Sequence, residues 1–129
     1  MLTKERKSNM TQEQVISRSV YQLRIYEVSS DKKEIFHDRF KNHALRIMER
    51  YGFEVVALWE SSSIMNFEFI YILKWPDTVT MERQWKLFLA DEEWIAIKEK
   101  TVSETGEPVL RATGRLLSEV EYSPPFNPT

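Results

Sequence analysis

The stretch that decides the fold is residues 67–75, which read FEFIYILKW. Their aromatic and β-branched side chains are typical of a β-strand, in which successive residues point to opposite faces. One side of this strand carries Phe69, Tyr71 and Leu73, and the other side carries Ile70 and Ile72. A strand that is apolar on both sides needs cover on both faces of its sheet. The sequence therefore predicts a sheet that lies between two other layers.

Three further strands and two helical regions surround this stretch. Alternating apolar residues predict strands at 20–28, 53–60 and 109–122. Helical spacing predicts a helix at 31–51, a second at 79–89, and a segment from the N-cap Asp91 to about residue 100. Residues 103–108 are expected to form a loop. The order β-α-β-β-α-β is that of a ferredoxin-like α+β fold with a four-stranded antiparallel sheet.

The helix predicted at 31–51 has one regular apolar face. The residues of this face are Phe36, Phe40, Ala44, Ile47, Met48 and Tyr51. Gly52 follows directly, and glycine adopts the positive φ angle of a helix C′ position at little cost. We therefore expect the helix to end at Gly52.

The face of the sheet with Tyr26, Phe69, Tyr71 and Leu73 is expected to be free of helices, because both helical regions fit on the opposite face. So large an apolar surface needs a partner. A second copy of the chain covers it most simply, since a two-fold interface is self-complementary. The sequence predicts a homodimer through this helix-free face. The alternative is that the side chains of one strand point to the opposite faces of the sheet from those given above.

The composition excludes several classes of protein. The 129 residues include 18 Lys and Arg against 20 Asp and Glu, so the chain lacks the basic excess of a nucleic-acid-binding protein. Its uncharged apolar stretches are too short for a membrane span. The absence of cysteine excludes disulfides and thiolate nucleophiles. The cytoplasm is the expected location.

Three parts are predicted along the chain. Residues 1–18 are polar and form an arm, in which 11–16 fit a single helical turn. Residues 19–123 form the domain. Residues 124–129 contain prolines that cannot continue a strand, so an extended tail is expected.

Several short motifs follow one another between residues 20 and 125. They are YQLRIY at 21–26, NHAL at 42–45, YGF at 51–53, FEFIY at 67–71, FLADEEW at 88–94 and YSP at 122–124. Their order and spacing resemble those of the NIPSNAP family. The resemblance implies the dimeric α+β barrel superfamily, in which ferredoxin-like units pair sheet to sheet. Two positions depart from the common pattern, because Arg46 stands where many members have Pro and Tyr71 where many have His.

The resemblance leaves the activity open. Relatives in the superfamily include cofactor-free monooxygenases, haem-degrading enzymes, isomerases and ligand-sensing modules, and a shared fold does not choose among them. The departure at Tyr71 removes the imidazole that would otherwise serve as a base or a haem ligand in the cavity.

The candidate ligand-binding residues are Arg24, Tyr26, Phe69, Tyr71 and Leu73. The strands at 20–28 and 67–75 are central neighbours in a ferredoxin-like sheet, so a guanidinium and two phenols converge among apolar side chains. Such a pocket between paired sheets suits a planar or anionic small molecule. The alternative is a structural interface in which Arg24 pairs with a carboxylate such as Glu68 or Glu119.

The other side chains that could take part in chemistry have patterns that indicate structural roles. His37 and His43 are six positions apart in the predicted helix and do not share a face, so no metal site is expected. Trp85, Phe88 and Trp94 have the spacing of a helical core. The sequence has neither a glycine-rich phosphate loop nor a serine nucleophile elbow, and no cofactor is expected.

The sequence thus favours a small-molecule-binding or regulatory domain without an identified catalytic residue. The alternative is a cofactor-free monooxygenase or isomerase that acts on a planar or anionic small molecule. Such an oxygenase needs a desolvated base beside its substrate, and a tyrosine or glutamate would have to supply it.

Overall fold

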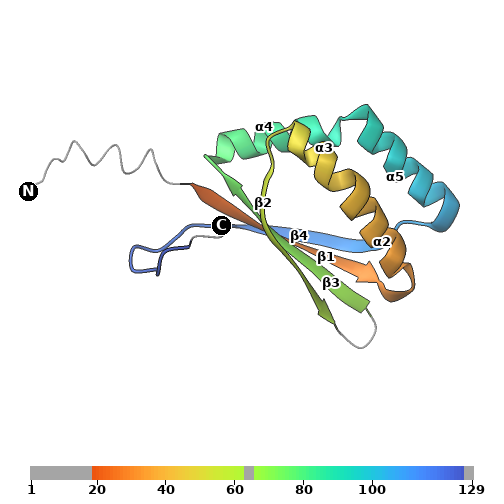
Figure 1. Ribbon diagram of the computed structural model, residues 1–129, viewed down its shortest axis with the longest axis horizontal. Coiled ribbons are helices and arrows are strands. Elements are labelled where there is room, and N and C mark those ends of the chain that lie inside the picture. The colour runs from red at the N-terminus through yellow and green to blue at the C-terminus, as the bar shows by residue number, and fades with distance from the viewer. Residues whose placement is uncertain (1–18, 63–65, 127–129) are drawn as a thin grey trace, which may run out of the picture.

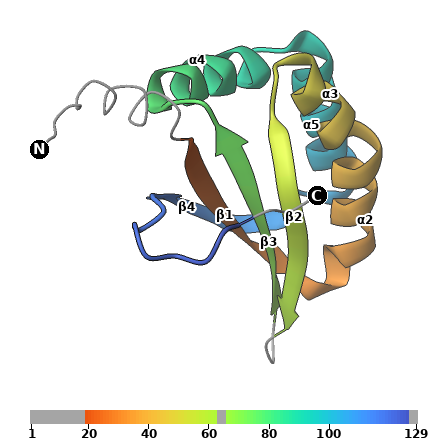
Figure 2. The same ribbon diagram turned by 60° about the vertical axis from the view of Figure 1, so that its left-hand side comes forward.

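The computed structural model of the chain describes residues 19–62 and 66–126. Four strands form one antiparallel sheet in the order β2-β3-β1-β4. Their bounds are β1 Val20–Ser29, β2 Glu54–Ser62, β3 Asn66–Trp75 and β4 Val109–Leu117. The helices lie on one face of this sheet (Figures 1 and 2). The predicted ferredoxin-like α+β fold is confirmed.

One long helical segment follows β1. It consists of the 3-10 turn η1 Ser30–Lys32, α2 Lys33–Arg39, the π-helical segment η2 Phe40–Ala44 and α3 Leu45–Arg50. In η2 the backbone N–H of Leu45 donates to the carbonyl of Phe40, five residues earlier. Gly52 follows with a φ angle of 77°. The predicted end of the helix at this glycine is confirmed.

The second helical region consists of α4 Thr78–Leu89 and α5 Glu92–Thr105. Both helices begin at an aspartate. Asp77 accepts a hydrogen bond from the backbone N–H of Thr80 at 2.7 Å, and Asp91 accepts one from Trp94 at 2.8 Å. Because these carboxylates satisfy backbone donors at the helix start, the predicted N-cap at Asp91 is confirmed.

The predicted boundaries near the C-terminus are partly wrong. Helix α5 continues through the first residues of the expected loop at 103–108 and ends at Gly106, whose φ angle is 86°. Strand β4 ends at Leu117 instead of residue 122, and residues 118–126 form an irregular segment. The arm at 1–18, with its expected helical turn at 11–16, lies outside the described residues.

The helices cover the face of the sheet opposite to the one predicted. Phe69, Tyr71 and Leu73 lie beneath them: the ring centroids of Phe69 and Phe40 are 4.7 Å apart, and Tyr71 and Leu73 are fully buried. Tyr26 of β1 pairs with Phe69 in the sheet and shares its face. The prediction that these four residues face a second copy is therefore wrong. Alternation shows which side chains share a face, but not on which face the helices dock.

The helix-free face carries smaller, aliphatic side chains at its centre. They are Leu23, Ile25, Ile70 and Ile72, all half-buried. Trp59 of β2 lies beside Ile70 and is 49% exposed. At one end of this face the C-terminal segment places the ring of Phe126 5.4 Å from that of Tyr21. In the described part of the chain, no helix combines the length and hydropathy that crossing a bilayer requires.

Candidate functional site

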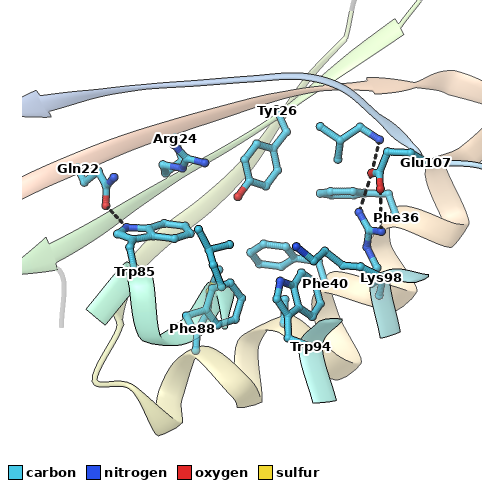
Figure 3. A pocket seen from close by; sticks show the side chains of 15 residues that line it. Gln22, Arg24, Tyr26, Phe36, Phe40, Trp85, Phe88, Trp94, Lys98 and Glu107 are labelled. Carbon is cyan, nitrogen blue, oxygen red and sulfur yellow. Dashed lines mark hydrogen bonds and ion pairs between the residues drawn. The ribbon is translucent and has the colours of Figure 1, made fainter. Parts of the chain in front are cut away.

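A cleft of about 380 Å³ lies between the sheet and the helices (Figure 3). Strand β1 contributes Gln22, Arg24 and Tyr26 to one wall. The opposite wall is formed by aromatic residues of the helices, which include Phe40, Trp85, Phe88 and Trp94. The cleft is therefore an apolar, aromatic space with a few polar side chains at defined positions, which is the usual composition of a small-molecule site.

Arg24 supplies a fixed positive charge to the sheet wall. Its guanidinium carbon lies 4.8 Å from the ring centroid of Trp85 and 5.4 Å from that of Tyr26. Burial acts to lower the pKa of Arg24, but the hydroxyls of Tyr26 and Tyr71 outweigh this effect and hold the pKa above its ordinary value.

Arg24 has no carboxylate partner among the described residues. Glu68 pairs with Glu27 in the sheet and lies on the helix-free face, and neither Glu68 nor Glu119 forms an ion pair with Arg24. The Nε atom of Arg24 is buried without a hydrogen-bond partner in the described part of the chain. In this structure Arg24 therefore does not pair with Glu68 or Glu119 in a structural interface, which was the alternative that the sequence left open.

Gly114 of β4 makes room for this arginine. It pairs with Arg24 in the sheet, and a Cβ atom at position 114 would lie 3.0 Å from both Nη1 of Arg24 and the carbonyl oxygen of Leu23. These distances are shorter than ordinary van der Waals contacts. A glycine at this position therefore allows the Arg24 side chain to approach β4 this closely.

Tyr26 and Tyr71 form a hydrogen-bonded pair beside Arg24. Their hydroxyl oxygens are 2.6 Å apart. Tyr26 lines the cleft, whereas Tyr71 lies behind it and is 0% exposed. Burial raises the pKa of Tyr71 well above its ordinary value, since a charged phenolate is poorly solvated there. The Tyr71 hydroxyl therefore stays protonated and neutral. The pair is better suited to donating hydrogen bonds than to removing protons.

Gln22 is held in place by two tryptophans. Its side-chain oxygen accepts hydrogen bonds from the indole N–H groups of Trp75 at 3.0 Å and Trp85 at 2.8 Å. Gln22 precedes Arg24 by two residues on the same strand, so both side chains lie on the same face. Figure 3 shows Gln22, Arg24 and Trp85 at one end of the cleft.

The other end of the cleft contains an ion pair between a buried arginine and an exposed glutamate. Arg39 of α2 donates from Nη1 and Nη2 to the two carboxylate oxygens of Glu107, at 3.2 and 2.9 Å. Lys98 lies 5.7 Å from the ring centroid of Trp94. The described lining thus includes the cations Arg24, Arg39 and Lys98 and the carboxylate Glu107. This excess of positive charge favours an anionic occupant.

Two of the five residues predicted from the sequence, Arg24 and Tyr26, line this cleft. The other three lie behind its wall: Tyr71 contacts Tyr26, Phe69 stacks beside Tyr26 with ring centroids 6.4 Å apart, and Leu73 pairs with Gln22 in the sheet. The site is therefore inside one chain, between sheet and helices. If the sheets of two copies pair, these five residues do not line the space between them.

The sequence reasoning missed Gln22, Trp85 and Lys98 as lining residues. The alternation along β1 already placed Gln22 on the side of Arg24 and Tyr26, and this signal could have found it. The helical spacing of Trp85, Phe88 and Trp94 predicts core packing; Phe88 and Trp94 are indeed buried, and all three also border the cleft. No group of three or more metal-ligating side chains occurs among the residues with described coordinates.

Fold and cleft together define a ferredoxin-like α+β domain with an aromatic cavity under its helices. Residues 21–124 match the NIPSNAP family, and the chain belongs to this family. No curated protein matches the sequence.

Solved structures show the same fold. An uncharacterized NIPSNAP-like domain protein from Burkholderia xenovorans is 17% identical, with a TM-score of 0.71 over 87% of this chain and 94% of its own. A NIPSNAP family protein of unknown function from Agrobacterium tumefaciens is 15% identical, with a TM-score of 0.70 over 84% of this chain and 94% of its own. At these identities the likeness extends to the fold alone.

Proposed function

We propose that this NIPSNAP domain binds a planar small molecule with an anionic group in the cleft between its sheet and helices. The observation that carries the proposal is Arg24, a half-buried cation without a described carboxylate partner on the wall of an aromatic cavity. Trp85 and Trp94 offer flat surfaces for a ring. A guanidinium supplies directed hydrogen bonds to a carboxylate or a similar oxygen anion.

Binding accounts for these residues better than catalysis does. A cofactor-free monooxygenase or isomerase, the alternative considered from the sequence, needs a base beside its substrate. The raised pKa of Tyr71 keeps its hydroxyl protonated. The carboxylate in the described lining, Glu107, is engaged by Arg39. A sensing or carrier role therefore fits this cleft, with Arg24 as the anchor for the anion.

Replacing Arg24 by methionine is expected to reduce the preference for anions strongly. We expect the wild-type protein to bind aromatic carboxylates, such as 2-naphthoate, at least about tenfold more tightly than their neutral carboxamides, because a hydrogen bond to a charged group contributes about 1.5–3 kcal/mol. Arg24→Met should abolish most of this difference. Isothermal titration calorimetry with a panel of such pairs measures this difference.

A matched control is Arg83→Met, which removes an exposed arginine of α4 outside the cleft. It should leave both affinities within about twofold of wild type, since screened surface charges contribute little. An unchanged preference for carboxylates in Arg24→Met would contradict the proposed function.

We further propose that the helix-free face is covered by a second copy of the chain. Along β3 this face carries Glu68, Ile70, Ile72 and Lys74, with the charges at opposite ends. A two-fold axis across the strands, close to residue 71, places Ile70 of one copy over Ile72 of the other and Glu68 over Lys74. Charge and apolar surface are then both complementary, as an isologous interface requires.

Trp59→Asp tests this homodimer. Trp59 is 49% exposed on the helix-free face, so an aspartate there should leave the fold intact and place an unpaired charge in the interface. Light scattering should give twice the 15.4 kDa chain mass for wild type and 15.4 kDa for the variant. Leu87→Asp, at a 47% exposed position of α4, is the control and should remain dimeric. A monomeric wild type would overturn the dimer.

A further inference from the structure

We propose that Gln22 is a specificity-determining residue of the cleft, and that Gln22, Arg24 and Tyr26 together form a subsite of hydrogen-bond donors. This subsite would select a deprotonated oxygen anion on a planar ring, such as an aromatic carboxylate or an enolate. The inference deepens the proposed function and rests on it, because it describes how the anion is distinguished from neutral groups of the same shape.

The orientation of the Gln22 carboxamide follows from its two partners. An indole N–H can donate a hydrogen bond but cannot accept one. Trp75 and Trp85 both direct this group at Gln22, at 3.0 and 2.8 Å, so the atom they contact must be the amide oxygen. Figure 3 shows this oxygen directed at Trp85, with the amide nitrogen on another side. The two N–H donors of Gln22 therefore lie on the side of the amide that does not contact the indole N–H groups, and we infer that they face the cleft.

The tryptophans make this orientation rigid. Trp75 is almost fully buried, and Trp85 also holds its ring 4.8 Å from the guanidinium carbon of Arg24. Rotating the amide by 180° would bring its nitrogen against two N–H groups and leave both indoles without an acceptor, so this orientation is excluded. Trp75 and Trp85 thus act as positioning residues for Gln22.

The tyrosine pair adds a third donor. The bond between the hydroxyls of Tyr26 and Tyr71 uses one hydrogen, so the other hydroxyl hydrogen needs a different acceptor. Tyr71 is 0% exposed, whereas Tyr26 lines the cleft. One arrangement leaves no buried donor without an acceptor. In it, Tyr71 donates to Tyr26, and Tyr26 directs its own hydrogen into the cleft.

Gln22, Arg24 and Tyr26 therefore present N–H and O–H groups to the same end of the cavity. The carboxylate of the described lining, Glu107, lies at the other end (Figure 3) and is held by Arg39. An oxygen anion can accept from all three residues. A neutral carboxamide brings N–H groups of its own, and these would face other donors without an acceptor, so it is rejected.

The variant Gln22→Glu tests this donor role with little change of shape. Glutamate keeps an oxygen for both indoles but replaces the amide donors by a second acceptor, which also carries negative charge and lies near Arg24. We expect the affinity for 2-naphthoate to fall by at least tenfold, to the level of 2-naphthamide. Calorimetry measures the two affinities, and thermal denaturation checks that the variant is folded.

Asn42→Asp is the control for net charge, because it adds the same charge on an exposed position of η2 that does not line the cleft. Its affinity for 2-naphthoate should stay within about twofold of wild type. A second measurement needs no variant: when wild type is titrated with 2-naphthoate, the side-chain NH2 resonances of Gln22 should shift in nitrogen-15 NMR spectra.

The outcomes separate this inference from the proposed function. If wild type prefers carboxylates and loses most of this preference in Arg24→Met, but Gln22→Glu binds 2-naphthoate as wild type does, the role of Gln22 is wrong and the proposed function stands. Unmoved Gln22 NH2 resonances at saturation would have the same meaning, including when Gln22→Glu does not fold. If wild type binds none of the aromatic carboxylates, both proposals are wrong.

Discussion

Tyr71→Asp is expected to unfold the domain. Tyr71 is 0% exposed beneath the helices, with its ring 5.3 Å from that of Phe40. The substitution removes a large aromatic ring and places a carboxylate where water cannot reach it. We expect a loss of more than about 5 kcal/mol, which equals the whole stability of many domains of this size. Circular dichroism should show a chain without the helical signal of wild type.

Two control variants show whether the loss of folding comes from a buried charge at position 71. Tyr71→Phe keeps the ring and removes the hydrogen bond to Tyr26, so it should cost only about 1 kcal/mol in urea denaturation. Trp59→Asp, on the other face, should retain the helical signal. A folded Tyr71→Asp protein of altered mass would instead mean that Tyr71 faces a partner.

Replacing Glu107 by glutamine is expected to lower the free energy of unfolding by about 2–3 kcal/mol at pH 7. The change leaves the Arg39 side chain, which is only 9% exposed, without its carboxylate partner. Breaking a fully buried ion pair costs about 3–5 kcal/mol, and we expect less here because the Glu107 side chain is 39% exposed and is partly screened by water. Urea denaturation at neutral pH measures the difference.

The ion pair of Arg39 and Glu107 also makes the stability of the fold depend on pH. Burial acts to raise the pKa of Glu107, but the hydrogen bonds from Arg39 and from the backbone N–H of Val109 outweigh it and hold the pKa below 4.5, its ordinary value. At acid pH the unfolded chain therefore binds a proton at Glu107 before the folded chain does. Stability from this pair is complete above about pH 4.5 and is lost as the pH falls through the folded-state pKa.

The difference between wild type and Glu107→Gln should consequently shrink below about pH 4.5, since protonated Glu107 resembles glutamine. Comparing the two proteins cancels the other carboxylates with lowered pKa values, such as Glu93. A difference that stays constant from pH 7 to pH 3 would show that the ion pair does not stabilise the fold.

Local signals were sufficient to predict the element order. Gly52 ends the first helix because its positive φ angle suits glycine, and Asp91 begins α5 because its carboxylate binds a backbone N–H three residues later. The end of α5 was missed, since Ser103 and Thr105 look like loop residues while the Thr105 hydroxyl bonds back to the carbonyl of Thr101 within the helix.

The location of the site depended on information that the sequence lacks. Alternation put Arg24 and Tyr26 on one face, and the structure retains this grouping. Which face the helices cover depends on how the whole chain packs, and β3 is apolar on both sides, so its pattern does not decide between them. The contact of Arg39 with Glu107 joins residues 68 positions apart, and no local pattern indicates it.

The π-helical segment Phe40–Ala44 has a consequence for how such domains diverge. Steps of four residues in an α-helix overshoot a full circle by roughly 40°, yet Phe36, Phe40, Ala44 and Met48 all border the cavity. The wider turn of η2 takes back part of this drift. A related chain with one residue fewer at this turn would keep its strands in register while a different set of side chains rotated into the cavity. The gain or loss of a single residue at this turn would thus change the lining of the cavity while the sheet stays the same.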